Sequence, residues 1–137
     1  MKTNPNIKEF FESYSKKLQE VLQESDWSPI EELATDIQNC WNDGRRLFLC
    51  GNGGSAGNAI HLANDFIYGI AKTTGGGLRA ISLSDNSAVI TCLANDIGYD
   101  HIYSEQLAVQ AEKGDLLIAL SGSGNSPNIL RAVEQAK

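Results

Sequence analysis

Residues 46–55 read Arg-Leu-Phe-Leu-Cys-Gly-Asn-Gly-Gly-Ser, and this stretch decides the class of fold. An almost unbroken apolar run is typical of a strand that is buried on both faces of a parallel sheet. Glycines follow at once, and a helical pattern begins at Ser55. A buried strand that turns through glycine into a helix is the opening of a β-α-β unit, so the sequence predicts an α/β protein.

Two more short apolar runs, residues 78–83 and 115–120, repeat this pattern further along the chain. Strands that alternate with helices favour an open parallel sheet with helices on both faces and right-handed crossovers. Thr73-Thr-Gly-Gly-Gly77 has the most flexible composition, and we expect it to be an exposed connection. The predicted helices of this part cover residues 55–70, 86–94, 101–112 and 126–137.

The first 44 residues predict two helices. Apolar residues recur at steps of three and four between Ile7 and Leu22, which makes one continuous stripe. Ser28 before Pro29 is typical of a helix start, and Gly44 of a helix end. We expect residues 1–44 to form a helical pair that buries its stripe against another subunit, and residues 45–137 to form the α/β domain.

The charge balance excludes several classes of protein. There are 17 acidic and 11 basic side chains, a net charge of −6, and the basic ones form no cluster that would attract a nucleic acid. No apolar run could span a membrane and the N-terminus has no signal-peptide pattern, so we expect a cytoplasmic protein with no membrane partner. The cysteines are Cys40, Cys50 and Cys92, an odd number without a C-x-x-C pair, and this favours free thiols over disulfides or a structural zinc site.

Two loops rich in glycine and serine each stand between a predicted strand and a predicted helix: Cys50-Gly-Asn-Gly-Gly-Ser55 and Ser121-Gly-Ser-Gly-Asn-Ser126. Glycines let backbone N–H groups approach an anion, and a helix N-terminus adds partial positive charge. Both loops leave the carboxyl ends of parallel strands, where ligands of open α/β sheets bind, so they can converge on one phosphate.

Other interpretations of the first loop stay open. A single loop of this kind is equally consistent with a tight turn that needs glycine for packing. The spacing Gly51-x-Gly53-x-x-Ala56 also matches a loose dinucleotide fingerprint, although the second strand is followed only by Asp85 as a candidate ribose-binding acid. A P-loop is excluded because no Gly-Lys-Ser/Thr follows.

The helix after the first loop carries His61 and Asp65 four residues apart, so both lie on one face. This pair could share a divalent metal, or the carboxylate could serve as a general base. The plain alternative is a solvated surface pair, and two ligands alone do not make a zinc site. The other histidine, His101, is expected at a helix start or on the surface.

Taken together, Leu-Cys-Gly-Asn-Gly-Gly-Ser55, His61, Ala94-Asn-Asp-Ile-Gly98 and Ser121-Gly-Ser-Gly-Asn-Ser126 resemble the phosphoheptose isomerase branch of the SIS (sugar isomerase) domain family, which has a flavodoxin-like fold. The resemblance runs from the N-terminal helices to Lys137. It implies isomerisation of sedoheptulose 7-phosphate to D-glycero-D-manno-heptose 7-phosphate through an enediol. It also implies a zinc ion and a homotetramer whose active sites lie at subunit interfaces.

The resemblance also implies roles for particular residues. His61 would be a metal ligand, and Asp65 stands where the family has its catalytic glutamate, so it would be both the proton-transfer base and a ligand. Aspartate keeps the charge but is one methylene shorter, and a misplacement of about an ångström can cost ~10²-fold in rate. The remaining residues would bind the substrate: Asn52, Gly53 and Gly54 at the sugar, Ser55, Ser121, Gly122, Ser123 and Ser126 at the phosphate, and Asn95 and Asp96 at the hydroxyls.

The same family pattern continues beyond the equivalent of Lys137 with two more strands and a final helix, which contribute a glutamine and a histidine. We therefore expect residues 45–137 to be an incomplete SIS domain. The competing hypothesis is a non-catalytic phosphosugar-binding or protein-interaction protein of the same fold, similar to the relative that binds the bacterial replication initiator.

Overall fold

The predicted parallel sheet is present, with three strands in the part of the chain that the computed structural model describes, residues 6–137. The strands are β1 (Arg46–Gly51), β2 (Arg79–Ser82) and β3 (Leu116–Leu120), in the spatial order β2-β1-β3. Gly51 at the end of β1 is opposite Leu120 at the end of β3. The predicted fold class, an open parallel α/β sheet, is confirmed.

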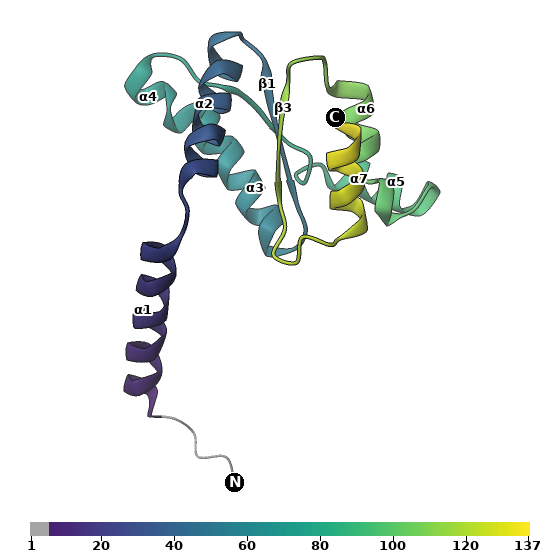
Figure 1. Cartoon of the computed structure of the whole chain (residues 1–137). Coiled ribbons are helices and arrows are strands. Elements are labelled where there is room, and N and C mark those ends of the chain that lie inside the picture. The colour runs from purple at the N-terminus through teal and green to yellow at the C-terminus, as the bar shows by residue number, and fades with distance from the viewer. Residues whose placement is uncertain (1–5) are drawn as a thin grey trace. The chain divides into compact units, whose positions relative to one another are not determined.

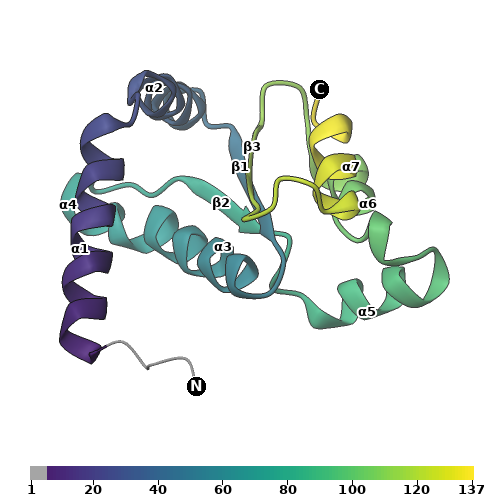
Figure 2. The same cartoon turned by 60° about the horizontal axis from the view of Figure 1, so that its bottom comes forward.

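The helices alternate with these strands as predicted. The second half of α2 and all of α3 cover one face of the sheet, and α6 and α7 cover the other (Figures 1 and 2). The α-helices are α1 (Ile7–Glu24), α2 (Ser28–Asn42), α3 (Gly54–Asn64), α4 (Ala71–Thr74), α5 (Ser87–Asp96), α6 (Ser104–Gln110) and α7 (Pro127–Gln135), with a π-helical turn at Asp65–Gly69 and a 3-10 turn at Tyr99–His101.

Strand β1 is the centre of the core, because its side chains alternate between two buried faces. Leu47 and Leu49 pack with Cys40 of α2 and Ala59 of α3. On the opposite face, Phe48 and Cys50 pack with residues of α6 and α7, among them Leu107, Ile129 and Ala132. All four β1 side chains are essentially inaccessible, which agrees with the apolar run in the sequence.

Strand β3 differs from the expectation of a strand buried on both faces. Its five residues are only partly buried. The physical reason is position: β1 covers one edge of β3, and no strand among residues 6–137 pairs with the other edge.

Two predicted helices have different bounds in the structure. The helix predicted over residues 55–70 is interrupted by the π-helical turn, in which the Ile70 N–H donates to the Asp65 carbonyl at 3.0 Å. The helix predicted over residues 101–112 is α6, and it begins only at Ser104 because the chain first makes the 3-10 turn.

Helix α2 begins and ends close to the predicted positions. Ser28 is its first residue rather than its cap, because the Asp26 carboxylate accepts hydrogen bonds from the Ser28 N–H and hydroxyl, both at 3.0 Å. Gly44 follows the helix with φ +66°, as expected of a terminating glycine.

The described residues divide into two units, one ending at Ala34 and one running from Thr35 to Lys137. This division falls inside α2, whereas the sequence placed a boundary after residue 44. In the first unit, α1 has no buried residue, and the apolar stripe of the sequence is exposed along its length. None of the described helices is long and apolar enough to cross a membrane.

Candidate functional site

The two glycine-serine loops begin side by side at the carboxyl edge of the sheet. Because β1 pairs with β3, the loop after Gly51 and the loop after Leu120 leave neighbouring strands. One loop leads into α3 and the other into α7, so two helix N-termini are at this edge. Since β1 lies between β2 and β3, the gap between β1 and β3 is the point where the direction of the crossovers reverses, which is where open α/β sheets bind ligands.

The first loop depends on a close backbone approach at Gly51. A Cβ atom on Gly51 would lie 2.7 Å from the backbone carbonyl group of Ser55, so only glycine fits there. The turn is closed by a hydrogen bond from the Ser55 N–H to the Asn52 carbonyl at 3.0 Å. This geometry folds the start of α3 back onto the end of β1.

The second loop holds its hydroxyl groups in fixed positions. The Ser121 hydroxyl oxygen accepts the Gly124 N–H at 3.1 Å, and the Ser123 hydroxyl oxygen accepts the Asn125 N–H at 3.2 Å. Ser126 is the N-cap residue of α7, as predicted, and its side chain makes no capping hydrogen bond. Because an accepting hydroxyl keeps its own proton, these serines can still donate to the oxygens of a bound anion.

The base of the first loop is fastened to the end of β2 and to α6. The Gly51 N–H donates to the Ser84 hydroxyl oxygen at 3.2 Å, and the Tyr103 hydroxyl donates to the Gly51 carbonyl. Tyr103 is 2% exposed, and burial raises the pKa of its phenol, so it stays protonated and remains a donor at neutral pH. The loop is therefore held by two segments that are distant from it in sequence.

Asn52 joins the first loop to α7. Its side-chain amide and that of Asn128 form a reciprocal pair: Asn52 Nδ2 donates to Asn128 Oδ1 at 2.9 Å, and Asn128 Nδ2 donates to Asn52 Oδ1 at 2.8 Å. The Tyr99 hydroxyl also donates to Asn52 Oδ1, at 3.2 Å. The first loop is thus connected by direct hydrogen bonds to the helix that follows the second loop.

His61 of α3 and Asp65, the first residue of the π-helical turn that follows it, lie together, as predicted. His61 Nε2 is 3.4 Å from Asp65 Oδ2, and the two side chains are 76% and 53% exposed. Both could bind a metal ion, but residues 6–137 contain no group of three or more His, Cys, Asp or Glu side chains that could hold one. His61 and Asp65 are therefore a pair of possible metal ligands that no third His, Cys, Asp or Glu side chain of the described residues joins.

Asn95 and Asp96 are at the end of α5, and their side chains hydrogen-bond within this helix. Asn95 Nδ2 donates to Asp96 Oδ1 at 2.8 Å, and the Cys92 thiol donates to Asp96 Oδ2 at 3.4 Å. The nearest connection from this segment to the loops is Tyr99, through its hydrogen bond to Asn52.

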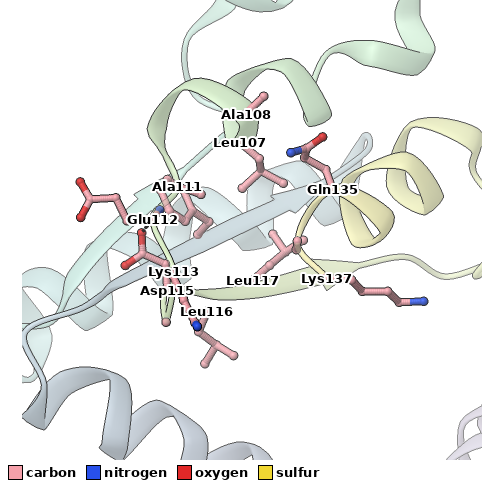
Figure 3. A pocket seen from close by; sticks show the side chains of 13 residues that line it. Leu107, Ala108, Ala111, Glu112, Lys113, Asp115, Leu116, Leu117, Gln135 and Lys137 are labelled. Atoms are coloured by element: carbon pink, nitrogen blue, oxygen red, sulfur yellow. Dashed lines mark hydrogen bonds between the residues drawn. The ribbon is translucent and has the colours of Figure 1, made fainter.

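A pocket of about 400 Å³ lies at the opposite edge of the sheet (Figure 3). Its lining includes Asp115 and Leu116 at the start of β3 and Gln135 at the end of α7. Loops at the carboxyl ends of the strands do not contribute to it, so this hollow is separate from the predicted site.

Four residues at the site were not predicted from sequence: Ser84, Tyr99, Tyr103 and Asn128. Tyr99 and Tyr103 are four residues apart, with His101 between them. This repeat in the sequence could have marked the two tyrosines as candidate site residues. His101 itself is partly buried, with Nδ1 3.8 Å from Glu105 Oε1. Asn128 could not have been found this way, because a polar residue in the first turn of a helix is usually exposed, and only the tertiary structure buries it to 1%.

The fold and the site define a class: an open α/β protein with two glycine-serine loops where β1 and β3 end. A sequence profile of the SIS domain matches residues 9–137, and the chain belongs to this family.

The chain is similar to several phosphoheptose isomerases. It is 40% identical over 117 residues to that of Fusobacterium nucleatum, covering 85% of this chain and 59% of the relative, and 39% identical over 125 residues to that of Chlorobaculum parvum, covering 90% and 60%. The solved structure of phosphoheptose isomerase from Neisseria gonorrhoeae superimposes with a TM-score of 0.83 at 30% identity, covering 96% of this chain and 69% of that one. The chain thus spans about 60% of the length of the first two relatives.

Proposed function

We propose that this protein is an aldose–ketose isomerase that interconverts sedoheptulose 7-phosphate and D-glycero-D-manno-heptose 7-phosphate. The observation that carries the proposal is the pair of loops after β1 and β3, which start side by side and are joined by the Asn52–Asn128 amide pair. The names of the similar proteins support the same reaction.

The phosphate of the substrate would bind between the loops. Ser55, Ser121, Ser123 and Ser126, with the backbone of Gly122, supply hydroxyl and amide donors, and the N-termini of α3 and α7 supply partial positive charge. Such a site needs no lysine or arginine, which explains how a chain with a net charge of −6 can bind a dianion. Asn52, Gly53 and Gly54 would contact the adjoining part of the sugar.

The chemical step would use Asp65. Isomerisation requires a base that removes a proton from the carbon next to the carbonyl, leaving an enediolate, and returns a proton to the former carbonyl carbon, while a proton passes from the hydroxyl oxygen to the carbonyl oxygen. His61, 3.4 Å from Asp65, would keep the carboxylate oriented. Asn95 and Asp96 are proposed to bind substrate hydroxyl groups.

We further propose zinc as the cofactor, with His61 and Asp65 as two of its ligands. The support is the proximity of an imidazole and a carboxylate on one helix face. The described residues offer no third ligand of these types in the same group, so we assign the metal no step in the reaction.

A homotetrameric assembly with shared active sites belongs to the same proposal. Asp65 is ten residues beyond Ser55, about 15 Å further along a continuous helix at the usual rise per residue. A second subunit that brings its own α3 to the loops would shorten this separation. The exposed apolar stripe of α1 offers a contact surface for such an assembly.

We propose a cytoplasmic location. Cys40 and Cys50 are buried and unpaired, and Cys92 is exposed and unpaired, which fits a reducing compartment.

The direct test is incubation of the protein encoded by the complete gene with sedoheptulose 7-phosphate, with and without added zinc. We expect an aldose product, detected by coupling or by proton NMR, together with solvent deuterium incorporation at the carbon next to the carbonyl. No aldose under either condition would exclude the proposed reaction. A non-catalytic phosphosugar-binding protein would still bind the substrate in this experiment, but none of the relatives reported above bears the name of one.

A further inference from the structure

Asn128 is a fully buried polar side chain that connects the first loop to the helix after the second loop, and the proposed chemical step gives it no role. It is 1% exposed, in the first turn of α7, directly after the serine loop. A buried amide must have its hydrogen bonds satisfied, and these bonds can be traced atom by atom.

The hydrogen bonds of Asn128 are directed at one partner. Its Oδ1 accepts from Asn52 Nδ2 at 2.9 Å and from its neighbour's Ile129 N–H at 3.0 Å, and its Nδ2 donates to Asn52 Oδ1 at 2.8 Å. Among the residues of the structure, no buried side-chain nitrogen or oxygen lacks a partner. All three of these hydrogen bonds hold Asn52 or the start of the helix to which Asn128 belongs.

These hydrogen bonds leave the side-chain amide of Asn52 with one free hydrogen-bond donor. Its Oδ1 accepts from Asn128 Nδ2 at 2.8 Å and from the Tyr99 hydroxyl at 3.2 Å. The Tyr103 hydroxyl is 3.4 Å from the same oxygen. One N–H of its Nδ2 is used by Asn128. A carboxamide has two such N–H groups, so the second N–H is what remains for a ligand.

We propose that Asn128 is a positioning residue that locks the Asn52 amide with its second N–H toward the ligand and couples the sugar-binding loop to the phosphate-binding loop. The inference rests on the proposed function, and it makes Asn52 a donor only: it would recognise a hydroxyl, carbonyl or phosphate oxygen and would not accept from a substrate hydroxyl.

The test compares Asn128→Asp with Gln135→Glu, which makes the same chemical change at an exposed position on the same helix. The aspartate keeps the shape but cannot donate to Asn52 Oδ1. We expect the affinity for sedoheptulose 7-phosphate, measured by calorimetry, to fall about tenfold, as for the loss of one positioned hydrogen bond, while the affinity for inorganic phosphate changes less than about threefold. Gln135→Glu is expected to match the wild type for both probes.

Equal losses for both probes, or no loss for either, would overturn the inference. A wild-type protein that does not bind sedoheptulose 7-phosphate would instead count against the proposed function. If Asn128→Asp does not fold, the side-chain amide signals of Asn52 in the wild-type protein decide. We expect one of the two Nδ2 protons of Asn52 to exchange slowly with solvent and to keep its chemical shift when the ligand is added, while the chemical shift of the other changes. Two equivalent, rapidly exchanging protons would contradict the proposal.

Discussion

At the scale of single residues, the candidate chemistry is divided between exposed and buried side chains. His61 at the end of α3 and Asp65 directly after it are exposed and lie 3.4 Å apart. Asn52, in contrast, has its amide bonded to Asn128 and Tyr99. An exposed group can be tested by replacing it with a side chain that lacks its reactive group. A buried group can be tested by removing one of its hydrogen bonds.

The proposed base gives the first prediction. Replacing Asp65 with asparagine keeps the shape and removes the proton acceptor, so kcat should fall by about 10²–10⁴ while sedoheptulose 7-phosphate still binds. Steady-state kinetics and calorimetry measure the two effects, and Asp85→Asn, another exposed acid, is the control. A kcat within threefold of wild type would show that Asp65 is not the base.

The exposed thiol gives a second prediction, on pH dependence. A hydrogen bond to Asp96, and then the negative charge of that carboxylate, raise the pKa of Cys92. The thiolate is the reactive form, so a raised pKa slows alkylation at a given pH. Asp96→Asn should therefore speed the reaction of Cys92 with a disulfide reagent at pH 8, whereas Asp85→Asn should not.

The buried thiols provide the internal reference for that experiment. Burial raises the pKa of Cys50 to about 12 and also raises the pKa of Cys40, so both remain protonated at pH 8. One thiol per chain should react in the folded protein and three after unfolding. Equal rates for the Asp96→Asn variant and wild type would contradict the assigned cause.

At the scale of elements, the end of α3 is shaped by a contact with the segment that leads into β2. The Leu78 N–H donates to the Phe66 carbonyl at 2.9 Å, inside the π-helical turn that begins at Asp65. A Cβ on Gly77 would lie 1.9 Å from the Ile67 carbonyl oxygen. Composition alone predicts a flexible, exposed connection over residues 73–77. In the structure, the last residue of this segment, Gly77, packs against the π-helical turn.

This contact predicts a difference between adjacent glycines. Gly77→Ala should destabilise the protein by about 2 kcal/mol or more, because the methyl group must displace backbone of the π-helical turn. Gly76 has open space around its would-be Cβ and no positive φ, so Gly76→Ala should be neutral or stabilise by up to about 1 kcal/mol. Urea unfolding of the two variants measures this, and similar midpoints would refute the close contact.

At the scale of the whole molecule, the first unit has apolar surface that its own residues do not cover. Phe11 and Leu18 of α1 are 60% and 48% exposed, and the stripe they belong to is continuous. A stripe of this kind is typical of a helix that packs against another chain. The expected partner is another copy of this protein.

The corresponding prediction concerns the oligomeric state. Leu18→Glu puts a charge into the stripe and should dissociate the assembly, whereas Gln23→Glu adds the same charge on the opposite side of the helix and should not. Light scattering at micromolar concentration measures both. A monomeric wild-type protein, or equal masses for the two variants, would remove the support for assembly through α1.

The sequence was sufficient for the order of elements, the parallel sheet, the two loops and the proximity of His61 to Asp65. These features follow from local rules: apolar periodicity, glycine and serine at strand ends, and the four-residue repeat of a helix. The π-helical turn and the late start of α6 were not predictable, because segments distant in sequence hydrogen-bond there: Leu78 to Phe66 in the turn, and Tyr99 and Tyr103 to the first loop before α6.

Only the tertiary structure decided which polar side chains are buried at the site. Asn52 and Asn128 are separated by 76 positions, and nothing local marks them as partners. They meet because β1 and β3 are neighbours in the sheet, which places the end of one strand beside the helix that follows the other. By itself, then, the sequence determined an α/β protein with two glycine-serine loops at strand ends, and the folded chain determined how these loops come together, since long-range strand pairing sets what local periodicity cannot.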